Sequence, residues 1–477
     1  MRYHSTRGQV KGLTFEEALY TGYADDGGIL LPDNIPVIDR DTLRSWAGLT
    51  YIQLAKIIIP YFISEEEIPR AELNELLDNA FSRFRHPDIA PIKKCRDGLN
   101  VMELFHGVTW AFKDLALSCV GQFLQYFLSK RKKHLTILVG TSGDTGSAAI
   151  EAVRGMKYVD IIVFLPRGRC TKIQELQMTT VLEDNVHVFR CDGSSDDLDI
   201  PIKACFQDTE FCHHHNLSSI NSINWARIMV QAVHYIYGYL QMCPECDRDV
   251  EFVIPTGACG NVTSGFIAQQ MGVPIKFVCA VTQNDIVART VKNGEYKLAS
   301  EVIQTLAPAM DIQIPYNMER IWSILTNNDT QLVKGLMEKF ERDSAVKVPD
   351  DLTNKVREVI VDTYVATDED VKVTMKRVFT ENDYLVCPHT AVGVAYHYKQ
   401  MRKESESGTK ALQLIIATAS VAKFDEAMKA AELRIPQNDD VNKLMSLPTR
   451  YQDLEKDQDW LLALRSKIEQ ITKQTQS

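Results

Sequence analysis

The sequence ELFHGVTWAFKDLAL, residues 103–117, holds one lysine, Lys113, between an apolar Ala-Phe pair and Asp114. The pattern predicts that Lys113 stands at the start of a helix, behind a loop that contains a glycine. Apolar neighbours remove water from an ammonium group, which lowers its pKa and makes the amine a nucleophile for an aldehyde. A lone lysine is more often an exposed residue of a helix N-terminus. Two glycine loops further along the chain favour the chemical interpretation.

Both loops follow the same plan of strand, glycine-rich turn and helix. The first, LTILVGTSGDTGSAAI, covers residues 135–150, and the second, FVIPTGACGNVTSGFIAQQMG, covers residues 252–272. The free N–H groups and the dipole at such a helix N-terminus favour an anion. Neither loop has the Gly-Lys-Ser/Thr of a Walker motif or the spacing of a dinucleotide-binding fingerprint. Two anion sites and a reactive lysine therefore suit a phosphorylated aldehyde cofactor and a substrate with a carboxylate.

Three further motifs carry a resemblance to a known family. They are SSINSINWARI at residues 218–228, PHTAVG at 388–393 and ATASVAKF at 417–424. With the lysine stretch and the two loops, they resemble the threonine synthase family of fold-type-II pyridoxal-phosphate enzymes, from RGQVKGLTFEEAL at residues 7–19 onward. The resemblance implies an α/β fold with two doubly wound lobes and an N-terminal, mainly helical domain. It also implies pyridoxal 5'-phosphate as cofactor, a phosphorylated amino acid as substrate, and Lys113 as the catalytic residue, which forms a Schiff base with the cofactor and then carries protons.

The resemblance assigns roles to individual residues around this lysine. Backbone N–H groups around the cofactor phosphate are expected from Gly257, Ala258, Cys259, Gly260 and Asn261. Thr418 occupies the position whose hydroxyl meets the pyridine nitrogen, which leaves that nitrogen largely neutral because a hydroxyl brings no counter-charge. Asp144 is expected to face the cofactor or to cap its helix, since a carboxylate repels a substrate carboxylate. The residues expected to bind the substrate are Thr141, Ser142, Gly143, Thr145 and Arg227.

Arg227 lies in a stretch, residues 225–242, that predicts a helix apolar on most sides and therefore buried. A buried guanidinium needs an anionic partner. Arg227 is therefore the first candidate for binding the substrate phosphate, and Lys423 is the second. The alternative is that Arg227 forms only a structural ion pair.

The sequence departs from the family pattern at three places. Val108 replaces a proline, Ala258-Cys259 replaces an Asn-Phe pair, and Ser420-Val421 replaces a His-Pro pair. An imidazole at position 420 is a possible acid/base group for adding water, so its loss favours simple elimination. We therefore expect a phospho-lyase that converts O-phosphothreonine, O-phosphohomoserine or both to 2-oxobutanoate, ammonia and phosphate. Two alternatives stay open: a threonine synthase acting on O-phosphohomoserine, and a non-catalytic binding or secreted signalling factor that keeps the fold.

The amino-acid composition limits the classes of binding partner that we expect. The chain carries 53 basic and 63 acidic side chains, a formal charge of −10, and offers no net positive field to nucleic acid. The apolar stretch at residues 51–63 is too short to span a membrane and contains Lys56. The N-terminus has no apolar run typical of a secretory signal. We expect a cytoplasmic monomer or homodimer without nucleic-acid or membrane partners, with unconventional secretion as an open alternative.

Cysteine usage bears on redox state and on metals. Eleven cysteines without regular spacing indicate reduced thiols in a chain of this size. The cluster at residues 212–215, Cys-His-His-His, and the pair formed by Cys243 and Cys246 fit no standard zinc spacing. We therefore expect no metal site.

Patterning divides the chain into four parts. These are an N-terminal domain at residues 1–90, a large cofactor-binding lobe at 91–130 and 250–430, a small α/β lobe at 131–249, and a helical tail at 431–477. Thr14 and Glu17 form a capping-box pattern, and the spacing predicts a helix over residues 41–58. Strands that alternate with helices after Pro91 predict parallel sheets covered on both faces. We expect an irregular stretch up to about residue 328 and a helix over residues 351–361.

Overall fold

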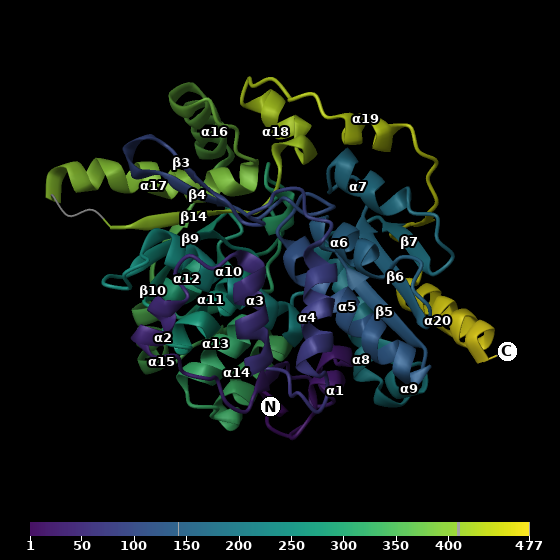
Figure 1. The fold of residues 1–477 in the computed structure, drawn as a ribbon. Coiled ribbons are helices and arrows are strands. Elements are labelled where there is room, and N and C mark those ends of the chain that lie inside the picture. Colours follow the sequence, from purple (N-terminus) through teal and green to yellow (C-terminus); the bar gives the residue numbers. More distant parts are fainter. Residues whose placement is uncertain (142, 408–410, 477) are drawn as a thin grey trace.

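Two sheets of mainly parallel strands form the centre of the computed structural model, which describes residues 1–141, 143–407 and 411–476 (Figure 1). The larger sheet consists, in spatial order, of β13 (Ile360–Val365), β10 (Ile275–Val281), β9 (Val250–Pro255), β14 (Gln413–Ala417), β4 (Asn100–Glu103) and β3 (Ile92–Lys94). The smaller sheet consists of β15 (Gln452–Leu454), β7 (Val186–Cys191), β6 (Val159–Pro166), β5 (Leu135–Gly140) and β8 (Leu217–Ser218). The pair β3 and β4 is antiparallel, and the other neighbouring pairs are parallel.

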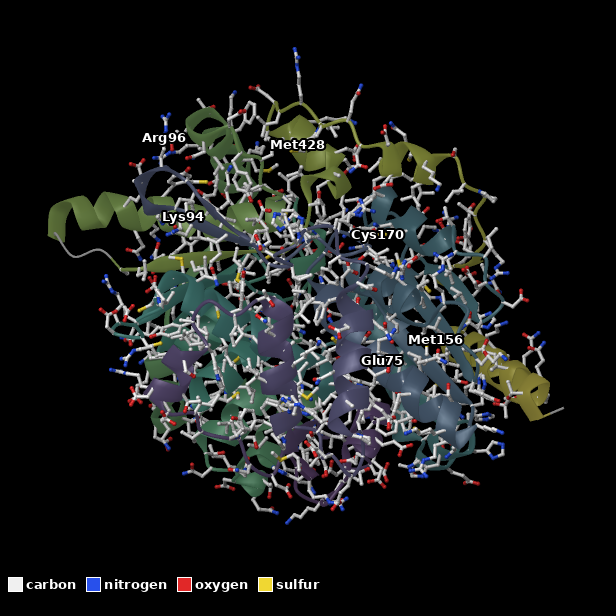
Figure 2. All side chains as sticks on the ribbon, viewed as in Figure 1. Glu75, Lys94, Arg96, Met156, Cys170 and Met428 are labelled. Atoms are coloured by element: carbon white, nitrogen blue, oxygen red, sulfur yellow. The ribbon has the colours of Figure 1, made fainter. Side chains whose placement is uncertain are left out.

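The helices cover both faces of these sheets, and side chains fill the space between the layers (Figure 2). The N-terminal helices are α1 (Phe15–Tyr20), α2 (Arg40–Ser45), α3 (Tyr51–Ile58) and α4 (Arg70–Phe81). Then come α5 (Lys113–Arg131), α6 (Asp144–Val153), α7 (Lys172–Thr179), α8 (Ser195–Gln207), α9 (Thr209–His214), α10 (Trp225–Met242) and α11 (Gly260–Gln270). The remaining helices are α12 (Ile286–Asn293), α13 (Met318–Leu325), α14 (Thr330–Asp343), α15 (Asp350–Val359), α16 (Asp368–Asn382), α17 (Pro388–Ser407), α18 (Asp425–Ala430), α19 (Asp439–Met445) and α20 (Trp460–Gln476). Two short antiparallel ribbons pair β1 (Tyr3–Ser5) with β2 (Leu30–Pro32), and β11 (Glu295–Lys297) with β12 (Ala345–Lys347).

The central strands form because their sequences are apolar on both faces. Residues 135–139 of β5 and 252–255 of β9 are all buried, as parallel strands between two helix layers require. The helix α10 is buried at every residue from Trp225 to Leu240 and packs against α11, α5 and α3. The N-terminal helices α1, α3 and α4 thus pack against α10 and α5, and the expected α/β fold is confirmed.

Local predictions were right where a capping signal was present. Thr14 caps α1 in a capping box with Glu17, as predicted. The helix expected over residues 41–58 is instead two helices, because Gly48 has a φ of +84° and Thr50 caps a new helix start.

Two other predictions on the C-terminal side of β10 were wrong. The stretch expected to be irregular contains α12 and α13, most of whose apolar residues are buried. The helix expected over residues 351–361 ends at Val359, and β13 follows without a turn and pairs in parallel with β10. The residues of β13 are β-branched or aromatic at five of six positions, IVDTYV, which suits a strand.

The tail crosses from one sheet to the other. The helix α18 packs beside α16, α19 lies against α7, and α20 packs on α8. β15 pairs with β7, so the tail, expected to be helical, also contributes a strand to the smaller sheet. Leu464, Ile468 and Ile471 of α20 are buried in the same core cluster as β7. The tail is therefore part of the packed structure.

Some general properties follow from the described part of the chain. Across residues 1–141, 143–407 and 411–476, no helix has both the length and the apolar character needed to cross a membrane. The same residues contain no group of three or more histidine, cysteine or acidic side chains arranged to bind a metal ion. All eleven cysteines are free thiols.

Candidate active site

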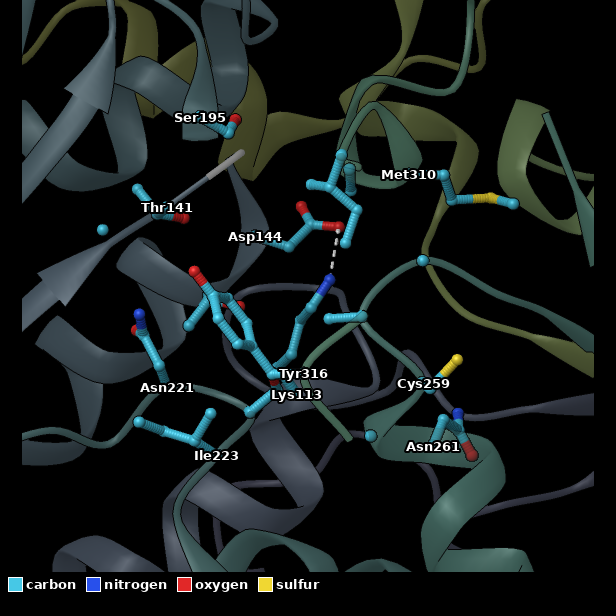
Figure 3. Close-up of a pocket in the computed structure, with 18 of the residues that line it drawn as sticks. Lys113, Thr141, Asp144, Ser195, Asn221, Ile223, Cys259, Asn261, Met310 and Tyr316 are labelled. Carbon is cyan, nitrogen blue, oxygen red and sulfur yellow. Dashed lines mark ion pairs between the residues drawn. The ribbon is translucent and has the colours of Figure 1, made fainter. Parts of the chain in front are cut away.

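Most of the predicted site residues meet in one pocket at the carboxyl ends of strands from both sheets (Figure 3). This edge of a parallel α/β sheet is where ligands usually bind. The predicted residues that line the pocket are Lys113, Thr141, Asp144, Thr145, Arg227, Gly257, Ala258, Cys259, Gly260, Asn261 and Thr418. Gly143 is buried beside the pocket without lining it, and Ser142 lies outside the described residues.

Lys113 is the first residue of α5, and its side chain points into the pocket (Figure 3). Its Nζ lies 3.7 Å from Asp144 Oδ2 and 4.9 Å from the centre of the Phe112 ring. Burial is the main influence on the pKa of Lys113 and lowers it, against the opposing effect of Asp144. The positive charges of Arg227 and Lys423 lower this pKa further. Lys113 is therefore closer to its neutral, nucleophilic form than a surface lysine is.

Asp144 binds a second lysine more closely than it binds Lys113. Lys423 Nζ lies 2.7 Å from Asp144 Oδ1 and also donates to Thr109 O at 2.9 Å. Gln174 Nε2 donates to the same Asp144 oxygen at 2.8 Å. Burial alone would raise the pKa of Asp144, but the nearby lysines hold it well below its usual range. Lys423 has no exposed side-chain surface and does not line the pocket, so the expectation that it binds a substrate phosphate is wrong.

The loop at residues 257–261 leaves its backbone donors free. Within the described residues, no group accepts a hydrogen bond from the N–H groups of residues 257–260. Cys259 is the N-cap of α11 and has a φ of 59°, in the left-handed region. Asn317 Nδ2 holds the loop by donating to Ala258 O at 3.0 Å. These free N–H groups at a helix N-terminus can bind a phosphate.

Asn261, at the end of this loop, has a fixed orientation. Its Oδ1 accepts hydrogen bonds from Tyr235 Oη at 2.5 Å and from His234 Nε2 at 3.1 Å. Because Oδ1 serves both donors, the amide Nδ2 is the remaining polar atom, and it is buried without a partner among the described residues. Asn261 thus offers a directed donor to whatever fills the pocket.

The loop at residues 140–146 is supported from within. Thr141 Oγ1 accepts hydrogen bonds from Gly143 N at 3.0 Å and from Gly146 N at 2.9 Å. Gly143 has a φ of +138°, and a Cβ there would lie 2.6 Å from the side chain of Gln174. The N–H of Gly143 is therefore already engaged, and the residues of this loop that line the pocket are Gly140, Thr141, Asp144 and Thr145.

Arg227 has the surroundings of an anion-binding residue. It is 2 % exposed, and its Nη1 donates to Ile220 O at 3.0 Å. Its Nε has no hydrogen-bond partner and its guanidinium no salt bridge to any described residue. Burial lowers the pKa of Arg227 to about 10, which still leaves it charged. The anionic partner expected from the sequence is therefore not a protein side chain of the described residues.

His389 lines the pocket and was not among the predicted site residues. The N–H of Ala309 donates to His389 Nε2 at 3.1 Å, so the ring proton must be on Nδ1. Burial lowers the pKa of His389 to about 3, which keeps the ring neutral. Its Nδ1 is buried without a partner among the described residues. The motif PHTAVG was available as a signal, but the bond to Ala309 depends on a contact 80 residues away.

Helix α8 contributes two acidic residues to the pocket, and neither was among the predicted site residues. Asp196 and Asp199 line it together with Tyr23 and Tyr316. Burial, together with the nearby Asp196, raises the pKa of Asp199 to about 7, against the opposing effect of Lys203. Burial raises the pKa of Asp196 to about 6. The stretch SSDDLD at residues 194–199 reads as an ordinary capped helix start, so its sequence gives no sign of this burial.

Comparison with known proteins shows which class of enzyme has this site. Residues 87–418 match the family described as pyridoxal-phosphate dependent enzyme. Residues 2–81 match the threonine synthase N terminus and residues 390–463 the threonine synthase C-terminal family. The chain is therefore a pyridoxal-phosphate dependent enzyme of fold type II. Within that class it belongs to the threonine synthase family.

Individual relatives are similar over nearly the whole chain. Threonine synthase-like 2 of Xenopus laevis is 52% identical and covers 99% of this chain and 99% of its own length. Threonine synthase-like 2 of Homo sapiens is 50% identical over 100% of this chain and 99% of its own length. The solved structure of threonine synthase from Brucella melitensis with bound pyridoxal phosphate has a TM-score of 0.88 and 35% identity, covering 98% of this chain and 99% of that one. The expected family, fold and cofactor are confirmed.

The pocket fits this cofactor on its own geometry. The free N–H groups at residues 257–260 match a phosphate, and Lys113 offers an amine for the aldehyde. Thr418 Oγ1 is buried and lacks a hydrogen-bond partner among the described residues, as a hydroxyl reserved for the pyridine nitrogen should be. Its backbone carbonyl accepts from Phe112 N at 2.8 Å, which places Thr418 beside the start of α5.

Proposed function

We propose that this enzyme is a pyridoxal-phosphate dependent phospho-lyase that releases phosphate from O-phosphothreonine, O-phosphohomoserine or both. Either isomer, with one water, gives 2-oxobutanoate, ammonia and phosphate. The observation that carries the proposal is Arg227, a buried guanidinium in the pocket of Lys113 that lacks a carboxylate partner among the described residues. Such a cation needs an anion, and a substrate phosphate supplies one.

Each proposed role rests on a residue of the pocket. Bound pyridoxal phosphate supplies an electron sink for the electrons left on the substrate Cα. Lys113 is the proposed catalytic residue that removes the Cα proton, because its amine has a lowered pKa. Arg227 holds the phosphate as it leaves, and Thr141 and Thr145 bind the substrate carboxylate. The N–H groups of residues 257–260 and the Asn261 amide hold the cofactor.

Elimination is favoured because position 420, where the family pattern has a histidine, offers no acid/base group for adding water afterwards. Ser420 stands where the family pattern has a histidine, and its Oγ accepts from Ala422 N at 3.3 Å without lining the pocket. His389 does line the pocket, but its free ring atom is the Nδ1–H donor, and burial opposes a second proton. Adding water after the phosphate has left needs a positioned acid/base pair. Elimination needs only Lys113 and a residue that binds the leaving phosphate.

Threonine synthase activity is the alternative, favoured by 35% identity to the threonine synthase from Brucella melitensis over nearly the whole chain. This reaction also starts from a phosphorylated amino acid, O-phosphohomoserine, so Arg227 suits both. A non-catalytic role is the other alternative, and it requires neither the lowered pKa of Lys113 nor the free N–H groups beside it.

One experiment separates these functions. The holoenzyme is offered O-phosphothreonine and O-phosphohomoserine separately, and threonine, 2-oxobutanoate and phosphate are measured together. A phospho-lyase forms 2-oxobutanoate and phosphate in equal amounts. Threonine as the main product from O-phosphohomoserine would overturn the lyase in favour of the synthase. A purified protein that binds no cofactor and releases no phosphate would support the non-catalytic role.

A further inference from the structure

Lys423 is the centre of a buried junction between segments that are far apart in the sequence. It ends the short helix η4 (Val421–Lys423), which follows β14 of the larger sheet. Its ammonium binds Asp144 at the start of α6, on the side of the smaller sheet, and Thr109 O in the loop that leads to α5. The side chain is 0% exposed. A fully buried lysine is rare and costly unless it is paired, so its partners define its role.

The two oxygens of Asp144 have different partners. Oδ1 receives hydrogen bonds from Lys423 at 2.7 Å and from Gln174 at 2.8 Å. Oδ2 lies 3.7 Å from Lys113 Nζ. Since electrostatic attraction weakens with distance, Lys423 compensates the charge of Asp144 more strongly than Lys113 does. The carboxylate therefore has a permanent counter-ion that is not the reactive lysine.

We propose that Lys423 is a positioning residue that neutralises Asp144 and so presents Lys113 to the cofactor aldehyde as a free amine. The condensation joins Lys113 Nζ to the aldehyde carbon and releases one water, and it needs the lone pair of Nζ. If Lys423 were absent, Asp144 and Lys113 would form a simple buried ion pair, which retains the proton on Lys113. The inference rests on the proposed role of Lys113 and is independent of the choice between lyase and synthase.

The other charged and titratable groups nearby do not replace Lys423. They are Arg227 on α10, His389 on α17, Asp114 on α5, and the thiols of Cys170 and Cys387, whose pKa values burial raises. Arg227 acts on Lys113 in the same direction as Lys423 but makes no salt bridge with Asp144. His389 is neutral, since burial lowers its pKa to about 3. Burial raises the pKa of Asp114 to about 6, and its oxygens accept from the N–H and hydroxyl of Thr109.

The test compares full-length holoenzymes with the substitutions Lys423→Met, Lys423→Arg, Asp144→Asn, and Asp144→Asn combined with Lys423→Met. The visible absorption band of the cofactor bound to Lys113 is titrated with pH, which reports proton binding at Nζ without any substrate. After the cofactor has been removed, the rate at which the band returns on adding pyridoxal phosphate is measured at several pH values. Thermal unfolding of each variant serves as the control for folding.

We expect Lys423→Met and Asp144→Asn to shift the midpoint of the pH titration in opposite directions. Lys423→Met should move the titration midpoint to higher pH by about one unit, and slow the return of the band at neutral pH roughly tenfold. Asp144→Asn should move the midpoint to lower pH, and the double variant should lie near the unsubstituted enzyme. Lys423→Arg should keep the midpoint within about 0.3 unit, because the charge remains. A residue that acts only through stability would change the unfolding temperature without this pattern.

The proposal is overturned if Lys423→Met forms the band with an unshifted midpoint. If Lys423→Met does not fold, Asp144→Asn alone decides, because an unshifted midpoint there shows that the charge of Asp144 does not act on Lys113. Failure of the underlying role of Lys113 has a different signature: Lys113→Ala would then keep the band. The two failures are thus distinguishable.

Discussion

The two glycine loops of the pocket have the same backbone plan but differ in what their threonine side chains do. Thr141 follows β5 and donates its N–H to Phe164 O on the neighbouring strand at 3.1 Å. Thr256 follows β9 and donates its N–H to Ala280 O on the neighbouring strand at 2.8 Å. The two loops therefore leave their sheets in corresponding ways.

The hydroxyl groups of these threonines point to different partners. Thr141 Oγ1 turns into its own loop and accepts from the N–H groups of Gly143 and Gly146. Thr256 Oγ1 turns back and donates to Ile254 O at 2.7 Å. The first loop is thus supported by its own side chain, while the N–H groups of the second stay available for an anion. The partner of one threonine hydroxyl thus separates the loop that is held by its own side chain from the loop whose N–H groups stay free.

The largest expected effect comes from Lys113, which lines the pocket together with residues of both loops. Lys113→Ala removes the amine that we assign to both cofactor attachment and proton transfer. We expect loss of the visible band and at least about a thousandfold slower phosphate release. Lys94→Ala, at an exposed position of β3, is the matched control and should change neither (Figure 2). A band that persists in Lys113→Ala would place the attachment at another lysine.

Substitution within the second loop should have the next largest effect. Gly257→Glu places a carboxylate among the free N–H groups, while a Cβ there meets nothing closer than 3.4 Å, so the fold tolerates it. We expect cofactor affinity to fall at least about a hundredfold, since charge and bulk oppose the phosphate. Gly260→Glu should behave in the same way.

The control for these variants is Gly335→Glu, on the exposed face of α14, where an added Cβ meets nothing within 4 Å. Affinity is measured by titrating cofactor-free protein with pyridoxal phosphate. Unchanged affinity in both variants would contradict the contrast between the loops, because it would show that the second loop does not bind the phosphate.

The sequence predicted the parts of the fold that depend on local signals. Buried parallel strands such as β5 and β9 are continuous apolar runs, and α10 begins and ends where its apolar pattern does. β15 could not be predicted, because Gln452–Leu454 has no strand pattern and pairs with β7 more than 250 residues earlier. An edge strand of this kind is fixed by its partner and not by its own residues.

Most residues of the candidate site were predicted, but His389, Asp196 and Asp199 were missed, and the charge states of the individual residues could not be predicted. Lys113, the two loops and Arg227 could be assigned because glycine turns and a cation in an apolar helix are visible in the sequence. The pairing of Lys423 with Asp144, and the tautomer of His389, depend on contacts that only the folded chain creates. Burial and partner distance decide charge, and neither is a local property of the sequence.

Substitution of Arg227 tests which anion each part of the pocket receives. Arg227→Met removes the buried charge, and we expect the KM for the phosphorylated substrate to rise roughly 10- to 100-fold while cofactor affinity stays within about threefold. The ligand-free protein should become more stable by about 1 kcal/mol, because an unpaired buried charge is lost. Steady-state kinetics and chemical denaturation measure the two effects.

Arg227→Lys is the control for this substitution, since it keeps the charge and loses the planar donor pair. It should raise the KM less than Arg227→Met does. If cofactor affinity falls instead of substrate affinity, the cofactor phosphate lies at Arg227, and the free N–H groups of residues 257–260 bind a different anion.

The smallest expected effect tests the contrast between the two threonines directly. Thr141→Val keeps the shape of the side chain but removes the oxygen that accepts from the buried N–H groups of Gly143 and Gly146. Two buried donors without a partner should lower the free energy of unfolding by about 1–3 kcal/mol. Thr256→Val removes only a hydroxyl that donates to Ile254 O, so its cost should be about 1 kcal/mol or less. Chemical denaturation of the two holoenzymes in parallel gives the difference, and equal losses would show that the hydroxyl rotamer does not distinguish the loops.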